Sequence, residues 1–157
     1  AAITPLDIHL TSFSMLFARY KGDLNSYLKG VKAIGSLVPG DKVLIAEGCT
    51  HHRQSDDIGT VKIPRWLNEK VGGSLDYEWA SGGGFPKDLT KYKLIIQCRA
   101  CMLNRREVLY RLSNAGEEKI PVINYGILIA YLNGILYRTL APFPEANALL
   151  KKLKKEN

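Results

Sequence analysis

The fold is decided by two short apolar runs, Lys42-Val43-Leu44-Ile45-Ala46 and Tyr92-Lys93-Leu94-Ile95-Ile96. The first run is bounded by the turn Pro39-Gly40-Asp41 on one side and by a polar loop on the other. A continuous apolar run of this length, set between turn and loop residues, predicts a strand that is buried on both faces. Strands of this kind belong to parallel sheets, so the two runs already favour an α/β fold.

The segments around these runs repeat the order strand, loop and helix. An amphipathic helix is expected at 23–34, where Asp23 is the N-cap and apolar residues recur at helical spacing. Gly116 is expected to close the helix 102–115, and the helix 125–140 is apolar enough to belong to the core. Further helices are expected at 63–71 and 144–155, a third strand at 120–123 and a weaker strand at 74–80. These βαβ units predict a mostly parallel sheet with helices on both faces.

The composition bounds the class of protein. With 157 residues, 46% hydrophobic and 24% charged, the chain has the size of one domain and excludes disordered, collagen-like and coiled-coil proteins. Its longest apolar run, 127–132, is far shorter than the ~20 residues of a membrane-spanning helix, and its opening residues carry no secretory signal pattern. Three cysteines suit a cytosolic fold that uses thiols for chemistry or metal. The net charge of +7 keeps nucleic acid or an acidic ligand among the candidate partners.

The cysteines all follow predicted strands. Cys49 comes directly after the first buried strand, Cys98 comes directly after the second, and Cys101 opens the helix behind it. In an open α/β sheet, ligands bind in the crevice outside the carboxyl ends of the strands. Both cysteine groups are therefore expected to converge on the same edge of the sheet, although they are far apart in the sequence.

The local spacings indicate a ligand set. Cys49-Thr50-His51-His52 places a thiol and two imidazoles in one loop, and Cys98-Arg99-Ala100-Cys101 is a CxxC at a strand-to-helix turn. Two thiolates at the CxxC spacing can bind one metal or one cluster. The helix N-terminus and the Arg99 charge favour the thiolate form that a metal ligand needs.

Three functions remain open on the residues alone. From spacing alone, the chain is equally compatible with two kinds of metal site. One is a zinc site of three cysteines and a histidine, and the other is an iron–sulfur cluster. A zinc site would fit a binding module for nucleic acid or protein, but the basic residues are dispersed and no known nucleic-acid motif is present. A CxxC can also be a dithiol redox pair, although this leaves Cys49, His51 and His52 without a role.

A family resemblance is carried by residues 11–23, 45–52, 56–65, 98–107 and 124–126. These segments resemble the HydF family, the maturation GTPases of FeFe-hydrogenases, whose pattern is Cys-x-His, a spacer and Cys-x-x-Cys. The spacer between His51 and Cys98 has 46 residues, which falls within the family's habit. Three departures stand out. Gln97 replaces a histidine that many members carry, Arg99 and Ala100 replace common glycines, and the chain has no phosphate-binding loop of a GTPase.

The resemblance implies that Cys49, Cys98 and Cys101 bind a 4Fe-4S cluster. Three thiolates leave one iron without a cysteine, and a weak ligand there can give way to an incoming group. His51 is the first candidate for that ligand. Close alternatives are His52, Asp56 and Asp57, although either aspartate also suits the cap of a helix.

The function implied by the resemblance is that of a scaffold and not of an enzyme. The family holds a di-iron subcluster precursor transiently and delivers it to the hydrogenase. This precursor carries cyanide and is anionic, so positive residues near the motifs are expected to help hold it. The candidate cofactor-binding residues are Arg53, Arg65, Arg99, Asn124 and Tyr125, with Lys62 and Arg105 nearby.

The resemblance also implies a domain organisation and partners. Residues 1–19 are expected to be the end of a preceding dimerisation domain, and residues 20–157 the iron–sulfur cluster-binding domain. The expected partners are the FeFe-hydrogenase apoprotein and the other maturation factors, in the cytoplasm, with a homodimer in the intact protein. Neither a membrane nor nucleic acid is expected as a partner.

Overall fold

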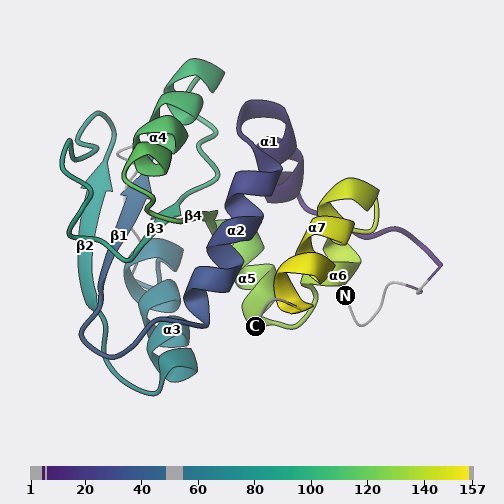
Figure 1. Ribbon diagram of the computed structural model, residues 1–157, viewed down its shortest axis with the longest axis horizontal. Helices are drawn as coiled ribbons and strands as arrows, with labels where there is room; N and C mark the ends of the chain where they lie inside the picture. The colour runs from purple at the N-terminus through teal and green to yellow at the C-terminus, as the bar shows by residue number, and fades with distance from the viewer. Residues whose placement is uncertain (1–4, 6, 49–54, 156–157) are drawn as a thin grey trace.

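A four-stranded sheet organises the computed structural model, which describes residues 5, 7–48 and 55–155 (Figure 1). Its strands run in the order β2-β1-β3-β4, and all neighbouring pairs are parallel. The strands are β1 (Lys42–Glu47), β2 (Asp76–Ser81), β3 (Leu94–Gln97) and β4 (Val122–Asn124). The two apolar runs are the central pair β1 and β3, and both are almost entirely buried. The predicted α/β fold with a parallel sheet is therefore confirmed.

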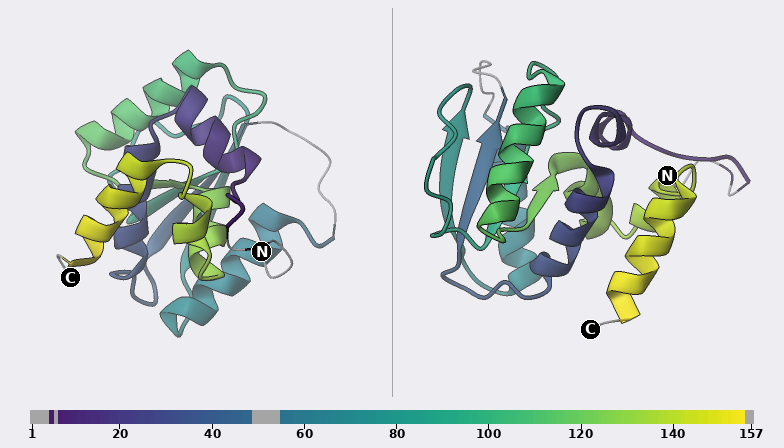
Figure 2. Two further views of the ribbon diagram at one scale, coloured as in Figure 1. Left: turned by 90° about the vertical axis from the view of Figure 1, so that its right-hand side faces the viewer. Right: turned by 45° about the horizontal axis from the view of Figure 1, so that its top comes forward.

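The chain leaves the two central strands in opposite directions. From β1 it passes through α3 (Ile63–Val71) to β2, and from β3 it passes through α4 (Arg105–Glu117) to β4. Because parallel crossovers are right-handed, opposite directions place the two helices on opposite faces of the sheet, as Figure 2 shows. The point between β1 and β3 is therefore the topological switch point at which α/β sheets bind ligands.

Helix α2 (Leu24–Ile34) covers the short edge strand β4. Asp23 is its N-cap, as predicted, and accepts a hydrogen bond from the Asn25 N–H at 3.0 Å. Gly30 allows the close approach, because a Cβ there would meet the Val122 carbonyl oxygen and lie 3.0 Å from Ile123 Cβ. On the opposite face of the sheet, Tyr77 of β2 donates from its hydroxyl to Asn68 of α3 at 2.9 Å.

The chain before α2 is helical and joins the core. Residues 13–21 form α1 (Phe13–Lys21), which Ser12 caps through its side chain. Met15 and Ala18 are buried in the same hydrophobic core as the sheet. Helix α1 thus spans the expected domain boundary between residues 19 and 20.

The predicted helix 102–115 has different ends in the structure. It begins at Arg105 because the Asn104 side chain accepts the Glu107 N–H at 2.8 Å and so acts as the N-cap. It continues through Gly116, and the prediction that Gly116 closes it was wrong. Lys119 adopts the left-handed conformation instead, with φ 57°, while the Ile120 N–H reaches back to the Ala115 carbonyl at 2.8 Å.

The predicted helix 125–140 is two helices, α5 (Tyr125–Leu132) and α6 (Leu136–Thr139). Gly134 interrupts it with φ +70°, and the Ile135 N–H closes the turn onto the Ala130 carbonyl at 2.9 Å. A π-helical turn, η1 (Ile58–Lys62), precedes α3, and the last helix is α7 (Pro144–Lys155), as predicted. None of the helices that the structure describes is long and apolar enough to cross a membrane.

Two of the helical glycines, Gly30 of α2 and Gly116 of α4, should respond differently to an added methyl group. Gly30→Ala is expected to lower the free energy of unfolding by about 2 kcal/mol or more, because the new Cβ collides with the β4 backbone. Gly116→Ala is the matched control, since nothing lies within 4 Å of its Cβ position. It is expected to raise stability by about 0.5–1 kcal/mol through helix propensity. Urea unfolding of both variants tests this, and equal effects would contradict the packing of α2 on β4.

Candidate functional site

The carboxyl ends of β1 and β3 are joined at the switch point. The Cys98 N–H donates to the Ala46 carbonyl at 2.9 Å, which extends the pairing of the two strands by one residue. The Gly48 N–H then donates to the Cys98 Sγ at 3.0 Å. Gly48 directly precedes Cys49 in the sequence, so the chain that enters the first cysteine motif is bonded to the second motif. Cys49, His51, His52 and Arg53 themselves lie outside the described residues.

The CxxC forms a tight turn around the Cys98 sulfur. The Ala100 N–H is a second donor to that sulfur, at 3.3 Å. Ala100 has φ 57°, a left-handed conformation that a glycine would adopt without strain, and its carbonyl accepts the Leu103 N–H at 3.1 Å. Two backbone N–H donors favour the thiolate form of Cys98, which is the form that binds metal.

Both described cysteines are free thiols. Cys98 is half-buried and Cys101 is exposed. Gly48 packs closely on their turn, because a Cβ at residue 48 would lie 3.0 Å from Leu103 Cγ and 3.4 Å from Ala100 Cα. The end of β1 and the CxxC turn therefore form one packed unit.

Lys21, at the end of α1, holds this turn from outside the sheet. Its Nζ donates to the carbonyls of Cys101 and Leu103, both at 2.9 Å, and to that of Ala100 at 3.4 Å. Sequence reasoning missed Lys21, because these partners lie about eighty residues further along the chain and no spacing pattern connects them.

A buried acid and a phenol flank the site on the α3 and α5 side. Glu47, at the end of β1, is buried, and the Tyr125 hydroxyl lies 3.4 Å from its Oε1 in a long hydrogen bond. Burial chiefly, and the charge of Glu47 next, raise the pKa of Tyr125, so the phenol stays protonated. Gly59 of η1 leaves room for this pair, because a Cβ there would lie 2.8 Å from Glu47 Oε1 and collide with the Tyr125 hydroxyl.

A second phenol belongs to α2. Burial, followed by the charges of Cys98 and Asp23, raises the pKa of Tyr27. The charge of Cys98 also contributes to the raised pKa of Tyr125, so both phenols lie within electrostatic range of this thiol. Tyr27 was not among the predicted site residues, because its place in the α2 apolar stripe marks it only as a core residue.

Gln97 stands directly before the CxxC, where the resembling family often has histidine. Its side chain is buried, and neither its amide oxygen nor its amide nitrogen has a hydrogen-bond partner within the described ranges. It pairs with Ala46 on one side and Asn124 on the other along the end of the sheet.

The predicted acidic ligands have other partners in the structure. Asp56 forms an ion pair with Lys62, with 2.8 Å between Oδ2 and Nζ. Asp57 accepts the N–H groups of Gly59 and Thr60 at 2.9 Å each, so it is the N-cap of η1. Within residues 5, 7–48 and 55–155, no group of three or more His, Cys, Asp and Glu could hold a metal ion.

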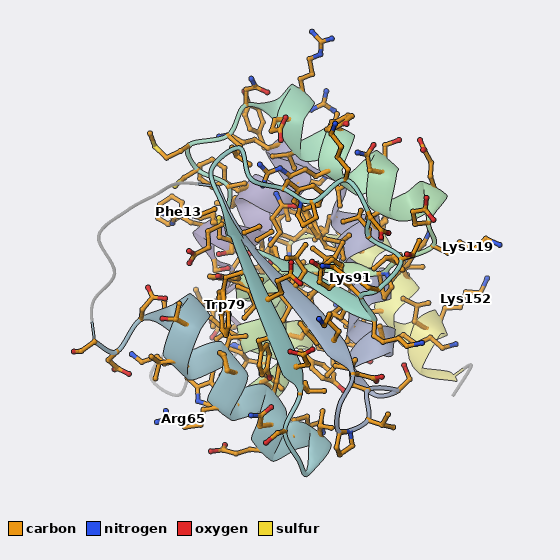
Figure 3. All side chains as sticks on the ribbon, turned by 90° about the vertical axis from the view of Figure 1, so that its left-hand side faces the viewer. Phe13, Arg65, Trp79, Lys91, Lys119 and Lys152 are labelled. Carbon is orange, nitrogen blue, oxygen red and sulfur yellow. The ribbon has the colours of Figure 1, made fainter. Side chains whose placement is uncertain are left out.

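The other predicted binding residues are dispersed. The Arg99 guanidinium lies over the Phe17 ring of α1 at 5.7 Å, beside the CxxC. Arg65 projects from the outer side of α3 into solvent (Figure 3). Asn124 is engaged in the fold, because its side chain accepts the Ile127 N–H at 2.8 Å and donates to the Ser14 carbonyl at 3.1 Å.

The fold and this site define the class: an α/β domain with a thiol site at the switch point of a parallel sheet. A family model described as the hydrogen maturase F tetramerization domain matches residues 25–142, about three quarters of the chain. The chain belongs to this family, which confirms the predicted resemblance to HydF. The description places the chain in hydrogenase maturation and implies an oligomer. No curated protein matches the chain in a sequence search.

Burial raises the pKa of several phenols, and the rise is largest for three of them. Tyr27, Tyr77 and Tyr125 are expected to ionise only as the chain unfolds, whereas an unfolded tyrosine ionises near pH 10. The free energy of unfolding should therefore fall as the pH rises above about 10, because only the unfolded chain then releases these protons. Phenolate absorbance and denaturant unfolding across this range measure both effects. Ionisation of these phenols in the folded chain would contradict the prediction. The variants Tyr27→Phe and Tyr125→Phe show which part of the absorbance change comes from each of these two phenols.

Proposed function

We propose that this chain binds a 4Fe-4S cluster through Cys49, Cys98 and Cys101 and serves as a scaffold in the maturation of an FeFe-hydrogenase. The observation that carries the proposal is the hydrogen bond from the Gly48 N–H to the Cys98 Sγ. It ties the residue before Cys49 to the CxxC, so the two halves of the predicted ligand set begin at one point of the sheet edge.

The described thiols fit such a cluster. Cys98 accepts two backbone N–H groups, an arrangement that stabilises a ligating thiolate, and Cys101 is exposed on the same turn. A protein sets the reduction potential of an iron–sulfur centre partly through hydrogen bonds to the cluster sulfurs and to the ligating thiolates. When bound, the cluster would supply one iron without a cysteine, open to an exchangeable ligand.

The chain's own candidates for that exchangeable ligand can now be ranked. Asp56 is held by Lys62, and Asp57 caps η1 with three hydrogen bonds, so each aspartate has a role in the fold. This favours His51, with His52 as the alternative, because neutral imidazole is a good metal ligand and both histidines lie within three residues of Cys49.

The role of the chain is to hold and hand over cargo rather than to catalyse a reaction. The cargo is the anionic di-iron subcluster precursor, and the receiving partner is the hydrogenase apoprotein, with the other maturation factors, in the cytoplasm. Arg99 is the described cation closest in sequence to the thiols, since it lies inside the CxxC itself. An oligomer agrees with the tetramerization description of the family.

Anaerobic reconstitution with iron and sulfide tests the cluster directly. We expect about four iron and four sulfide per chain, a brown chromophore and an electron paramagnetic resonance signal after reduction. Cys98→Ser and Cys101→Ser should each lower the cluster content, and Cys49→Ser should do the same. Stoichiometric zinc without a chromophore would overturn the proposal in favour of a zinc-stapled module. A metal-free chain that cycles a Cys98–Cys101 disulfide would favour a redox protein.

The structure separates two arginines that the motifs grouped together. Arg99→Glu is expected to lower the loading of the anionic precursor about fivefold, because a charge beside the thiols is reversed. Arg65→Glu changes the net charge equally from the outer side of α3 and is the matched control, with loading expected to be unchanged. Infrared bands of the bound cyanide ligands measure loading. Equal losses in both variants would show that only net charge matters.

A further inference from the structure

The Lys21 ammonium has its three hydrogen-bond donors directed at one turn. An ammonium carries three N–H groups, and the structure gives Lys21 Nζ three carbonyl partners, on Ala100, Cys101 and Leu103. Hydrogen bonds from a charged donor are roughly twice as strong as neutral ones. Lys21 is therefore bound to the backbone of the turn as a cation, although it comes from a separate helix.

These contacts set the shape of the turn that carries the thiols. On one side the Ala100 carbonyl faces Lys21, and on the other side the Ala100 N–H donates to the Cys98 Sγ. Ala100 adopts φ 57°, a left-handed conformation that is strained for a non-glycine residue. The charged hydrogen bonds from Lys21 offset this strain.

The same contacts bring positive charge to the site. Lys21 Nζ lies 5.0 Å from the centre of the Phe17 ring, and the Arg99 guanidinium lies 5.7 Å from the same ring. Both cations are thus held next to the CxxC by α1. A fixed positive charge near a metal–thiolate centre favours the more negative, reduced form of that centre.

We propose that Lys21 is a positioning residue of the metal centre, which keeps the Cys98–Cys101 turn closed and raises the reduction potential of the cluster that the turn binds. This inference rests on the proposed function, because it needs the chain to bind the cluster. It assigns to α1 a part in the site that the cysteine motifs do not reveal.

Three variants separate position from charge. Lys21→Met keeps the aliphatic stem but removes the charge and all three donors, whereas Lys21→Arg keeps the charge. Arg19→Met is the matched control, because Arg19 is exposed in the same last turn of α1 and no hydrogen bond or ion pair of its guanidinium occurs in the described part of the chain. Each full-length variant is reconstituted anaerobically with iron and sulfide, and circular dichroism checks that it is folded.

The expected result distinguishes Lys21 from a merely structural lysine. In Lys21→Met the midpoint potential of the cluster, measured by reductive titration, should fall, and loss of iron to a chelator should become about tenfold faster. Lys21→Arg should restore the potential, and Arg19→Met should match the wild type in both measurements. If Lys21→Met does not fold, Lys21→Gln gives the same reading, because it also lacks the charge.

The outcomes for the two proposals differ. Suppose that the wild-type chain binds the cluster, but Lys21→Met and Arg19→Met have the same potential and the same resistance to the chelator. This result would leave the proposed function standing and overturn the role of Lys21. A fall of the potential in Lys21→Arg as large as in Lys21→Met would also overturn it, because charge would then not be the cause. A wild-type chain that takes up neither iron nor sulfide would overturn the proposed function, and the role of Lys21 with it.

Discussion

The hydrogen bond between the Gly48 N–H and the Cys98 Sγ depends on β1 and β3 being adjacent and parallel. Because both strands end at the same edge, the residues that follow them meet without any further folding. The chain then diverges to opposite sides, towards α3 and α4, and the edge between the strands is left to loops. A thiol placed one residue past a strand, as Cys98 is, is therefore positioned by the sheet itself.

This arrangement explains which features the sequence could predict. The strands β1 and β3 were recognisable because burial on both faces requires a continuous apolar run. Their place at the switch point made Cys98 a candidate site residue without any knowledge of its contacts. Helix ends were less predictable, since Gly116 is compatible with a helix interior, and the chain closes α4 with Lys119 in a left-handed conformation. Likewise, Gly134 interrupts an apolar segment whose composition alone suits one long helix.

The support around the thiols could not be predicted, because it consists of contacts between distant segments. Nothing in the sequence shows why residue 126 is a glycine. In the structure, a Cβ at Gly126 would collide with Ser14 of α1. Lys21 has no neighbour in the sequence that points to the CxxC, and Phe17 is one of several aromatic residues. Only the packing of α1 against the rest of the domain brings them to the site.

The position of the positive charge matters more than its total. Lys42, Lys62 and Lys91 are each paired with a carboxylate, so they contribute little field beyond their partners. Lys21 and Arg99 instead contact carbonyls and an aromatic ring, which leave their charge uncompensated beside the thiols. An anionic cargo or a reduced cluster would respond to these two residues, because screening limits the influence of more distant charges to about 10 Å. The net charge of +7 is a sum over the whole chain, whereas the positive charge beside the thiols is set locally by the packing of α1.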